Sequence, residues 1–218
     1  MSAIICGYIW AYTYLFVAFV LSVFCKNILK TRTEDARKVV HIMAGFGWII
    51  LEQFFEGTVH TVIITGTFVV ITFFSSYVKS DYFSFMEIGE GNHGTAYFTI
   101  SMFLMAIVSF VVPTLFFPFG IGIICLSCGD GMAAIVGTKF GKKSKKIIGN
   151  KSIIGFVTCI VSSIVSIIFL CFYKGTQLSI VEILCIGLVA GILELISGKY
   201  DNFAIPFGVM ALSYIFLL

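Results

Sequence analysis

Apolar runs long enough to cross a bilayer recur along the whole chain, separated by short polar segments. A transmembrane helix needs about 20 predominantly apolar residues. The runs fall at 3–25, 39–55, 59–78, 95–112, 115–137, 153–173, 178–197 and 203–218. The second and the last run are short and Gly129-Asp130-Gly131 interrupts the fifth, so a count of seven spans stays open. The pattern predicts an all-α polytopic membrane bundle of about eight helices, with a single transmembrane domain over 1–218.

The composition requires a membrane environment. The 218 residues are 59% hydrophobic and only 11% charged, whereas a soluble domain carries about 25% charged residues. No soluble fold could bury this much apolar surface, so lipid must solvate most of the chain. The N-terminal run lacks a positive n-region and is longer than a signal-peptide core, so we expect it to be a retained span.

Other classes of site find little support. The seven cysteines are scattered through apolar segments, which indicates small hydrophobic residues and not a disulfide framework. No basic stripe is interleaved with stacking aromatic residues, so the sequence argues against nucleic-acid binding. The absence of a convincing internal repeat weakens the case for an inverted-repeat transporter.

The basic residues lie almost entirely on one predicted face. With eight spans, 13 of the 14 lysines and arginines fall in four connections on the same side, and only Lys174 falls on the other. The connections are 26–38, 79–94, 138–152 and 198–202. The positive-inside rule makes this face cytoplasmic and puts both termini outside. We expect the active site to face the cytoplasm, from a prokaryotic plasma membrane or a eukaryotic endoplasmic reticulum.

Two polar groups mark the first half of the chain. Arg37, Lys38 and His41 stand at the start of the second span, where Arg37 and His41 are one helical turn apart. They could bind a ligand, or they could be a positive-inside anchor with a buried histidine. Residues 86–95, with three glycines, could present backbone N–H groups to an anion. Asn92 and Thr95 in this loop could instead cap the next helix.

The third polar group has the most chemical content. Asp130 lies near the end of an apolar span, where a carboxylate is expensive and indicates function. Carboxylate oxygens suit Mg²⁺, and lysines such as Lys139 supply charge for phosphates. Lys151 and Ser152 begin the sixth span, where a helix N-terminus favours anions. Alternatively, the lysines are topology determinants and Asp130 pairs with a neighbouring lysine.

Glu194, Asp201 and Asn202 return to the same predicted edge as Asp130. Several acids and bases at one depth are the arrangement that phosphoryl transfer needs, because metal ions bridge phosphate oxygens and cations neutralise the developing charge. No Walker or protein-kinase loop is present, so any nucleotide chemistry must use another fold.

Taken in order, these groups resemble the membrane family of dolichol kinase, phytol kinase and CTP-dependent diacylglycerol kinase. The matching segments are Arg37-Lys38-x-x-His41-x-x-x-Gly45, Asn92-x-Gly94-Thr95-Ala96-Tyr97, Gly129-Asp130-x-x-Ala133-x-x-x-Gly137-x-x-x-Gly141, Asn150-Lys151-Ser152-x-x-Gly155 and Glu194 with Asp201-Asn202-x-x-x-Pro206. The resemblance covers about residues 37 to 206. Family members often carry Glu where this chain has Ile154, so no role is given to that position.

The resemblance implies transfer of the γ-phosphate of CTP, with Mg²⁺, to the hydroxyl of an isoprenoid alcohol (phytol, farnesol, polyprenol or dolichol) or of diacylglycerol. Asp130 is the expected magnesium ligand, with Glu194 or Asp201, and His41 or a carboxylate such as Asp201 guides the acceptor hydroxyl. The expected nucleotide and phosphate ligands are Arg37, Lys38, Asn92, Thr95, Lys139, Lys151, Ser152 and Asn202.

Two other functions stay open at this point. The related phosphatidate cytidylyltransferases share a similar Asp-to-Lys block and make a CDP-lipid, although their downstream His-Gly-Gly motif is not found here. A small transporter or lipid scramblase is the non-enzymatic alternative, but its charges would be spaced through the bilayer. The sequence does not identify the acceptor, the nucleotide, the number of metal ions or the oligomeric state.

Overall fold

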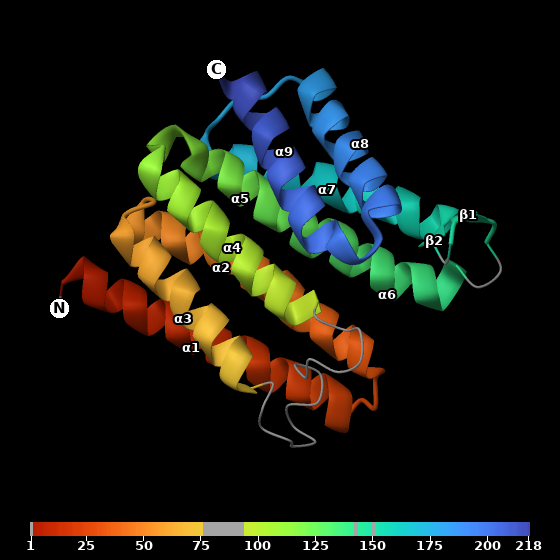
Figure 1. Ribbon diagram of the computed structural model, residues 1–218, viewed down its shortest axis with the longest axis horizontal. Helices are drawn as coiled ribbons and strands as arrows, with labels where there is room; N and C mark the ends of the chain where they lie inside the picture. The colour runs from red at the N-terminus through yellow and green to blue at the C-terminus, as the bar shows by residue number, and fades with distance from the viewer. Residues whose placement is uncertain (1, 76–93, 142–143, 150) are drawn as a thin grey trace. The chain divides into compact units, whose positions relative to one another are not determined.

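The computed structural model describes residues 2–75, 94–141, 144–149 and 151–218 (Figure 1). The chain divides into two compact units, residues 1–116 and 117–218. Each unit is described by itself, and the single transmembrane domain stays a prediction.

The first unit is a group of four helices in chain order. They are α1 (Ala3–Asn27), α2 (Thr33–Phe55), α3 (Val59–Ser75) and α4 (Gly94–Val111), followed by the short 3₁₀ turn η1 (Pro113–Leu115). Helix α1 packs along α2, and α3 packs along α4. The fully buried side chains include Trp48, Phe98, Met102 and Met105, so large apolar residues from α2 and α4 form the core of this unit.

Helix α2 begins at Thr33, six residues before the predicted span. Glu34 and Asp35 lie in its first turn, where acidic side chains favour the positive end of the helix dipole. The helix ends at Phe55. Its C-cap residue, Glu56, adopts a left-handed conformation (φ 45°) and is followed by Gly57 at φ 77°. Arg37, Lys38 and His41 are therefore helical residues and do not belong to a loop.

The second unit is organised around a continuous helical stretch from Phe116 to Phe140. Its parts are α5 (Phe116–Ile124), which starts at the last residue of the first unit, the π-helical turn η2 (Cys125–Asp130) and α6 (Gly131–Phe140). A hairpin of β1 (Lys146–Ile148) and β2 (Lys151–Ser152) follows, and then α7 (Ile153–Lys174), α8 (Ile180–Ser197), the 3₁₀ turn η4 (Gly198–Tyr200) and α9 (Asp201–Leu217). Every residue of η2 is buried, and this turn contacts α7, α8 and α9.

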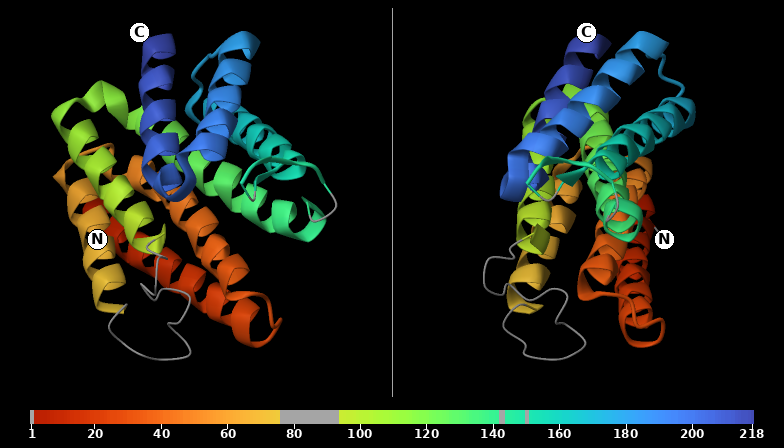
Figure 2. Two further views of the ribbon diagram at one scale, coloured as in Figure 1. Left: turned by 45° about the vertical axis from the view of Figure 1, so that its right-hand side comes forward. Right: turned by 90° about the vertical axis from the view of Figure 1, so that its right-hand side faces the viewer.

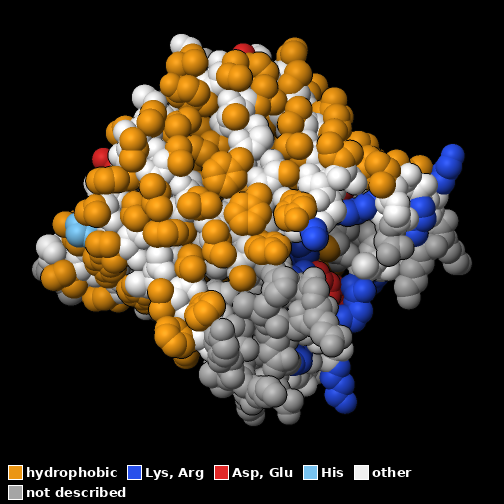
Figure 3. Space-filling view, viewed as in Figure 1, with side chains coloured by type: hydrophobic (Ala, Val, Ile, Leu, Met, Phe, Trp, Pro, Cys, Tyr) orange, Lys and Arg blue, Asp and Glu red, His pale blue; other side chains and the backbone are white. Residues whose placement is uncertain are grey.

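The helices match the predicted spans. Six stretches of the described residues are long and apolar enough to cross a membrane, and α3 is a shorter apolar helix. The stretch Ile180–Leu217 contains both α8 and α9, which run antiparallel after a turn at Gly198 (φ 56°), as both views in Figure 2 show. Apolar side chains are spread over much of the described surface drawn in Figure 3, and they far outnumber the charged ones there. The all-α polytopic membrane fold is therefore confirmed, and the membrane orientation stays a prediction.

Small residues let α6 lie close to α7. A Cβ atom on Gly137 would lie 3.3 Å from the Cα of Gly155, and one on Gly155 would lie 3.4 Å from the carbonyl oxygen of Ala133. A Cβ atom on Gly141 would meet the side chain of Ser152. Ala133, Gly137 and Gly141 recur every four residues, so they share one face of the helix. Much of the Gly-Asp-x-x-Ala-x-x-x-Gly-x-x-x-Gly motif is thus a surface for close helix packing.

This packing predicts that Gly137→Leu destabilises the protein, because the new side chain meets the backbone of Gly155, which has no room to rotate away. Overpacking of this kind removes about 1–3 kcal/mol of stability. The thermal unfolding of the purified protein in detergent measures the loss. Phe140→Leu, at an exposed position of the same helix, is the control, and equal melting of the two variants would contradict the packing assignment.

Candidate active site

Lys151 is the centre of a charged cluster in the second unit. Its ammonium group forms an ion pair with Glu194, whose side chain is 5% exposed and comes from α8. Burial disfavours the ammonium, but Glu194, Asp130 and Asp201 outweigh this effect and together raise the pKa of Lys151. These residues come from β2, α8, the end of η2 and the start of α9. The fold therefore brings together the three acids and the lysine that the sequence singled out.

Two buried oxygen atoms in this cluster have unused hydrogen-bonding capacity. Oε2 of Glu194 and Oδ1 of Asn202 are buried and have no hydrogen-bond partner within the described ranges. Asn202 meanwhile donates its side-chain amide to Oδ1 of Asp201 at 2.9 Å, and its backbone N–H donates to the same oxygen at 2.8 Å. A buried polar atom without a partner is costly, so both oxygens are candidates for ligand contacts.

Asp130 is held in place by the widened turn that precedes it. The residue is 4% exposed and ends η2, and such π-helical turns are frequent at functional sites. The preceding Gly129 faces α7, where a Cβ atom would lie 2.6 Å from Oγ of Ser163 and 3.1 Å from Sγ of Cys159. Glycine at this position therefore keeps the carboxylate-bearing turn close to α7. The helix runs through the glycines without the break that they suggested.

Ser152 has two available roles. Its Oγ accepts a hydrogen bond from the N–H of Gly155 at 3.1 Å, which makes it the N-cap of α7. A capping hydroxyl keeps its own proton for donation, and the 22-residue helix it caps favours an anion at its N-terminus. Position 152 is thus suited to a phosphate oxygen, although capping alone explains a serine there.

Pro206 in the closing motif has a local consequence for α9. Because proline has no N–H, it cannot donate to the carbonyl of Asn202 four residues earlier. The first turn of α9 therefore offers a backbone oxygen next to the side chains of Asp201 and Asn202.

The first predicted group lies in the other unit. Arg37 donates to Glu34 at 2.6 Å within α2, and its side chain is 11% exposed. Lys38 and His41 are buried, and the ring of His41 stacks on Phe98 with centroids 4.5 Å apart. Thr95 is buried in the first turn of α4. The convergence of these residues with the cluster around Lys151 stays a prediction.

The remaining predicted residues contribute less. Lys139 lies in the last turn of α6, with its ammonium group 5.5 Å from the centre of the Phe140 ring. Asn92 and the lysines at 142 and 143 lie outside the described residues, as does Asn150.

The carboxylates fit a magnesium ion that is bound partly by the protein and partly by phosphate oxygens. They do not fit a magnesium ion that is enclosed by protein ligands alone. Among the residues that the structure describes, no three His, Cys, Asp or Glu side chains form a metal-binding group. Mg²⁺ in phosphoryl-transfer sites takes one or two carboxylates and completes its shell with phosphate oxygens and water. Asp130, Glu194 and Asp201 supply such ligands, and Oε2 of Glu194 is available. The magnesium assignment stays a prediction.

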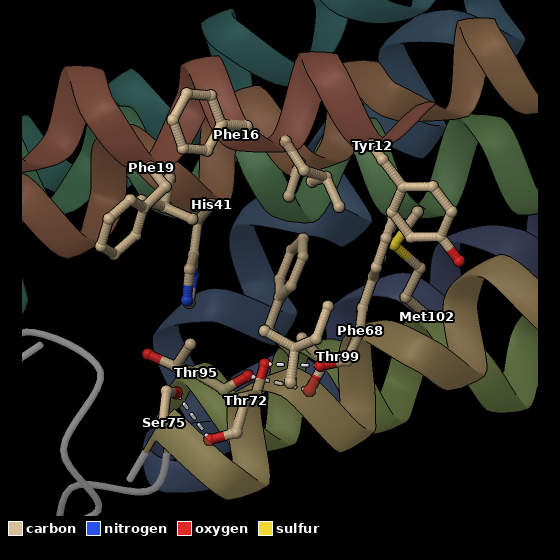
Figure 4. Close-up of a pocket in the computed structure, with 15 residues that line it drawn as sticks. Tyr12, Phe16, Phe19, His41, Phe68, Thr72, Ser75, Thr95, Thr99 and Met102 are labelled. Carbon is tan, nitrogen blue, oxygen red and sulfur yellow. Dashed lines mark hydrogen bonds between the residues drawn. The ribbon is translucent and has the colours of Figure 1, made fainter. Parts of the chain in front are cut away.

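Sequence reasoning missed several residues that shape these sites. Ser163 and Cys159 limit how closely Gly129 packs against α7. Phe98 stacks on His41, and Thr72 and Ser75 line the same pocket near His41 (Figure 4). Thr72 and Ser75 are three residues apart, so a polar face on an otherwise apolar helix was a signal that could have been noticed.

The raised pKa of Lys151 predicts its chemical reactivity. Only the neutral amine reacts with an acylating reagent, so the labelling of Lys151 should reach half its maximum above the ordinary lysine pKa of about 10.4. The stability that the ion pair contributes is fully present below the ordinary lysine pKa of the unfolded chain. It is lost as the pH rises through the higher pKa of Lys151 in the folded protein. Mass spectrometry of the labelled peptide gives the midpoint.

Glu194→Gln should lower this midpoint, since burial then acts on the ammonium without its main partner. Glu34→Gln, which removes an acid of the other unit, is the matched control. A midpoint for Lys151 that is the same in wild type and Glu194→Gln would exclude the proposed pairing.

Two known proteins are similar to this chain in sequence. A phytol kinase from Synechocystis sp. is 27% identical over 208 residues, which are 91% of this chain and 86% of that protein. The dolichol kinase sec59 of Schizosaccharomyces pombe is 37% identical over 89 residues, which are 39% of this chain and 17% of that protein. No family model matches the chain, and no solved structure matches it significantly. These relatives confirm that the chain resembles polyprenol and dolichol kinase-like membrane proteins, as its motifs indicated.

Proposed function

We propose that this protein is a CTP-dependent lipid-alcohol kinase, which transfers the γ-phosphate of the nucleotide to the hydroxyl of an isoprenoid alcohol or of diacylglycerol. The observation that supports it most is the cluster in which Lys151 pairs with Glu194 and is stabilised electrostatically by Asp130 and Asp201. The name of the relative that aligns over most of this chain, phytol kinase, supports an alcohol acceptor.

In the proposed reaction, the alcohol oxygen attacks the γ-phosphorus, and the bond from that phosphorus to the oxygen bridging it to the β-phosphate breaks. CDP leaves, the lipid phosphate forms, and the hydroxyl proton passes to a base, either His41 or a carboxylate. Catalysis of this kind is mostly positioning and charge stabilisation. Asp130 with Glu194 or Asp201 would hold magnesium, which would neutralise part of the charge on the phosphates.

The chain's own residues have distinct parts in this proposal. The protonated Lys151 binds a phosphate oxygen, and because Glu194 already fixes it, little reorganisation is needed when the nucleotide enters. Ser152 and the first N–H groups of α7 donate to a second phosphate oxygen. Further phosphate ligands in this proposal are Asn202 on α9 and Lys139 on α6. The proposal also gives a nucleotide- or phosphate-binding role to Arg37, Lys38, Asn92 and Thr95.

CTP labelled with ³²P separates the kinase from a cytidylyltransferase. The γ-label enters the lipid if the protein is a kinase, and the α-label enters it if the product is a CDP-lipid. A panel of lipid alcohols tested with CTP, ATP, GTP and UTP, with mass spectrometry of the product, identifies both substrates. Solute or lipid flux in liposomes without nucleotide would favour the transporter or scramblase.

Asp130→Asn should lower kcat by at least about a hundredfold while the protein stays folded, because the neutral amide loses the charge that stabilises the transferred phosphate. The matched control is Asp35→Asn, which removes an acid that pairs with Arg32 near the start of α2. An exposed pair of this kind contributes at most about 1 kcal/mol to stability. Activity of Asp130→Asn close to that of Asp35→Asn would refute the catalytic assignment.

A further inference from the structure

An apolar pocket of about 330 Å³ lies within the first unit, between α1, α2, α3 and α4. Aromatic side chains form much of its wall, among them Phe16, Phe19, Phe68 and Phe98. Its volume is near the lower end of the range for small-molecule pockets, about 300–1,000 Å³. It therefore has room for part of a lipid chain.

One end of this pocket is polar. Figure 4 shows His41, Thr95, Ser75 and Thr72 gathered at one end, away from Tyr12 and Met102. Thr72 and Ser75 donate their hydroxyl protons to helix carbonyls at 2.8 and 2.9 Å. Their oxygens can still accept hydrogen bonds, so this end can receive a hydroxyl group.

His41 lines the pocket with a buried ring nitrogen that lacks a hydrogen-bond partner among the described residues. The residue is 2% exposed, and the nitrogen concerned is Nε2. Figure 4 shows its imidazole directed toward the threonine and serine side chains at the polar end. A neutral imidazole has one acceptor nitrogen, so an alcohol hydroxyl could satisfy it.

The pocket also reaches the exposed apolar surface of the unit. Phe16 and Ile71 both line it and are 66% and 51% exposed. In a membrane-spanning helix group, exposed apolar side chains face lipid tails. A hydrocarbon chain can thus enter from the bilayer without passing through water.

We propose that this pocket is the acceptor site for an isoprenoid alcohol, with the hydroxyl at His41 and the first part of the chain between the aromatic walls. The inference rests on the proposed kinase function and selects among its acceptors. Diacylglycerol has two ester groups close to its hydroxyl. The pocket lining includes Phe98, which stacks on the ring of His41, and the apolar side chains of Val40 and Ala44. Burying esters against such residues is unfavourable, whereas a branched hydrocarbon fits them.

A bulky residue at the pocket's opening tests the site. Ile71→Trp narrows the opening, and Val70→Trp changes the neighbouring residue on α3, which is 52% exposed and does not line the pocket. Both side chains lie on the lipid-facing surface, so both variants are expected to fold. Ile71→Trp should raise the KM for farnesol at least about tenfold, the equivalent of about 1.4 kcal/mol, and Val70→Trp should leave it unchanged.

Photo-cross-linking locates the alcohol independently of turnover. A diazirine-bearing farnesol analogue should label peptides from α1 to α4 in wild type and Val70→Trp, and much less in Ile71→Trp. Phosphorylation of farnesol that is equally efficient in both variants, with labelling elsewhere, would overturn the pocket assignment and leave the kinase proposal intact. Labelling of the pocket without phosphorylation of any alcohol would overturn the kinase proposal alone. Preferred phosphorylation of diacylglycerol would overturn the selectivity.

The role of His41 has a separate test. His41→Phe keeps a ring against Phe98 but removes the acceptor nitrogen, so it should lower kcat by about a hundredfold or more while cross-linking persists. His41→Gln can still accept a hydrogen bond and should retain clearly more activity than His41→Phe. Equal activity of the two variants would show that the nitrogen does not contact the hydroxyl.

Discussion

The ion pair between Lys151 and Glu194, with Asp130 and Asp201 nearby, is the interaction on which the second unit depends. A charge left without a partner in a largely apolar structure is strongly destabilising. The hairpin that carries Lys151 and the ends of three helical segments must therefore meet at one place. The ammonium group of Lys151 needs acidic partners, and this need brings the carboxylates together at one place. The stability of the cluster and the chemistry proposed for it therefore have the same cause.

Close helix packing makes that meeting possible. The small residues of α6 and α7 allow their backbones to approach, and Gly129 allows the turn before Asp130 to contact α7. The widened turn η2 then presents Asp130 without breaking the helix. The Gly129 to Gly155 motif therefore combines two kinds of residue: its glycines allow close helix packing, and its charged residues are the ones proposed for phosphate and metal binding.

The first unit contains an apolar pocket with one polar end. Its pocket is lined by apolar residues from four helices, and a polar end contains a buried histidine whose Nε2 has no partner in the described parts of the chain. A lipid alcohol has the same division, with a hydrocarbon chain and one hydroxyl. The chemistry proposed for the two units is accordingly divided, since the first suits the acceptor and the second suits phosphate and metal.

The sequence by itself determined the helices, because about 20 apolar residues in a row have few alternatives to a membrane-spanning helix. It also identified Asp130, Lys151, Glu194 and Asp201, since charged residues at the ends of apolar spans are rarely there without a reason. The hairpin before α7 and the π-helical turn were not predicted, because both depend on how neighbouring segments pack. Only the tertiary structure decided that Lys151 pairs with Glu194, 43 residues away, and that Thr72, Ser75 and Phe98 join His41 around a pocket. Pairings and cavities of this kind arise where distant segments meet, and no local pattern of residues records which segments those are.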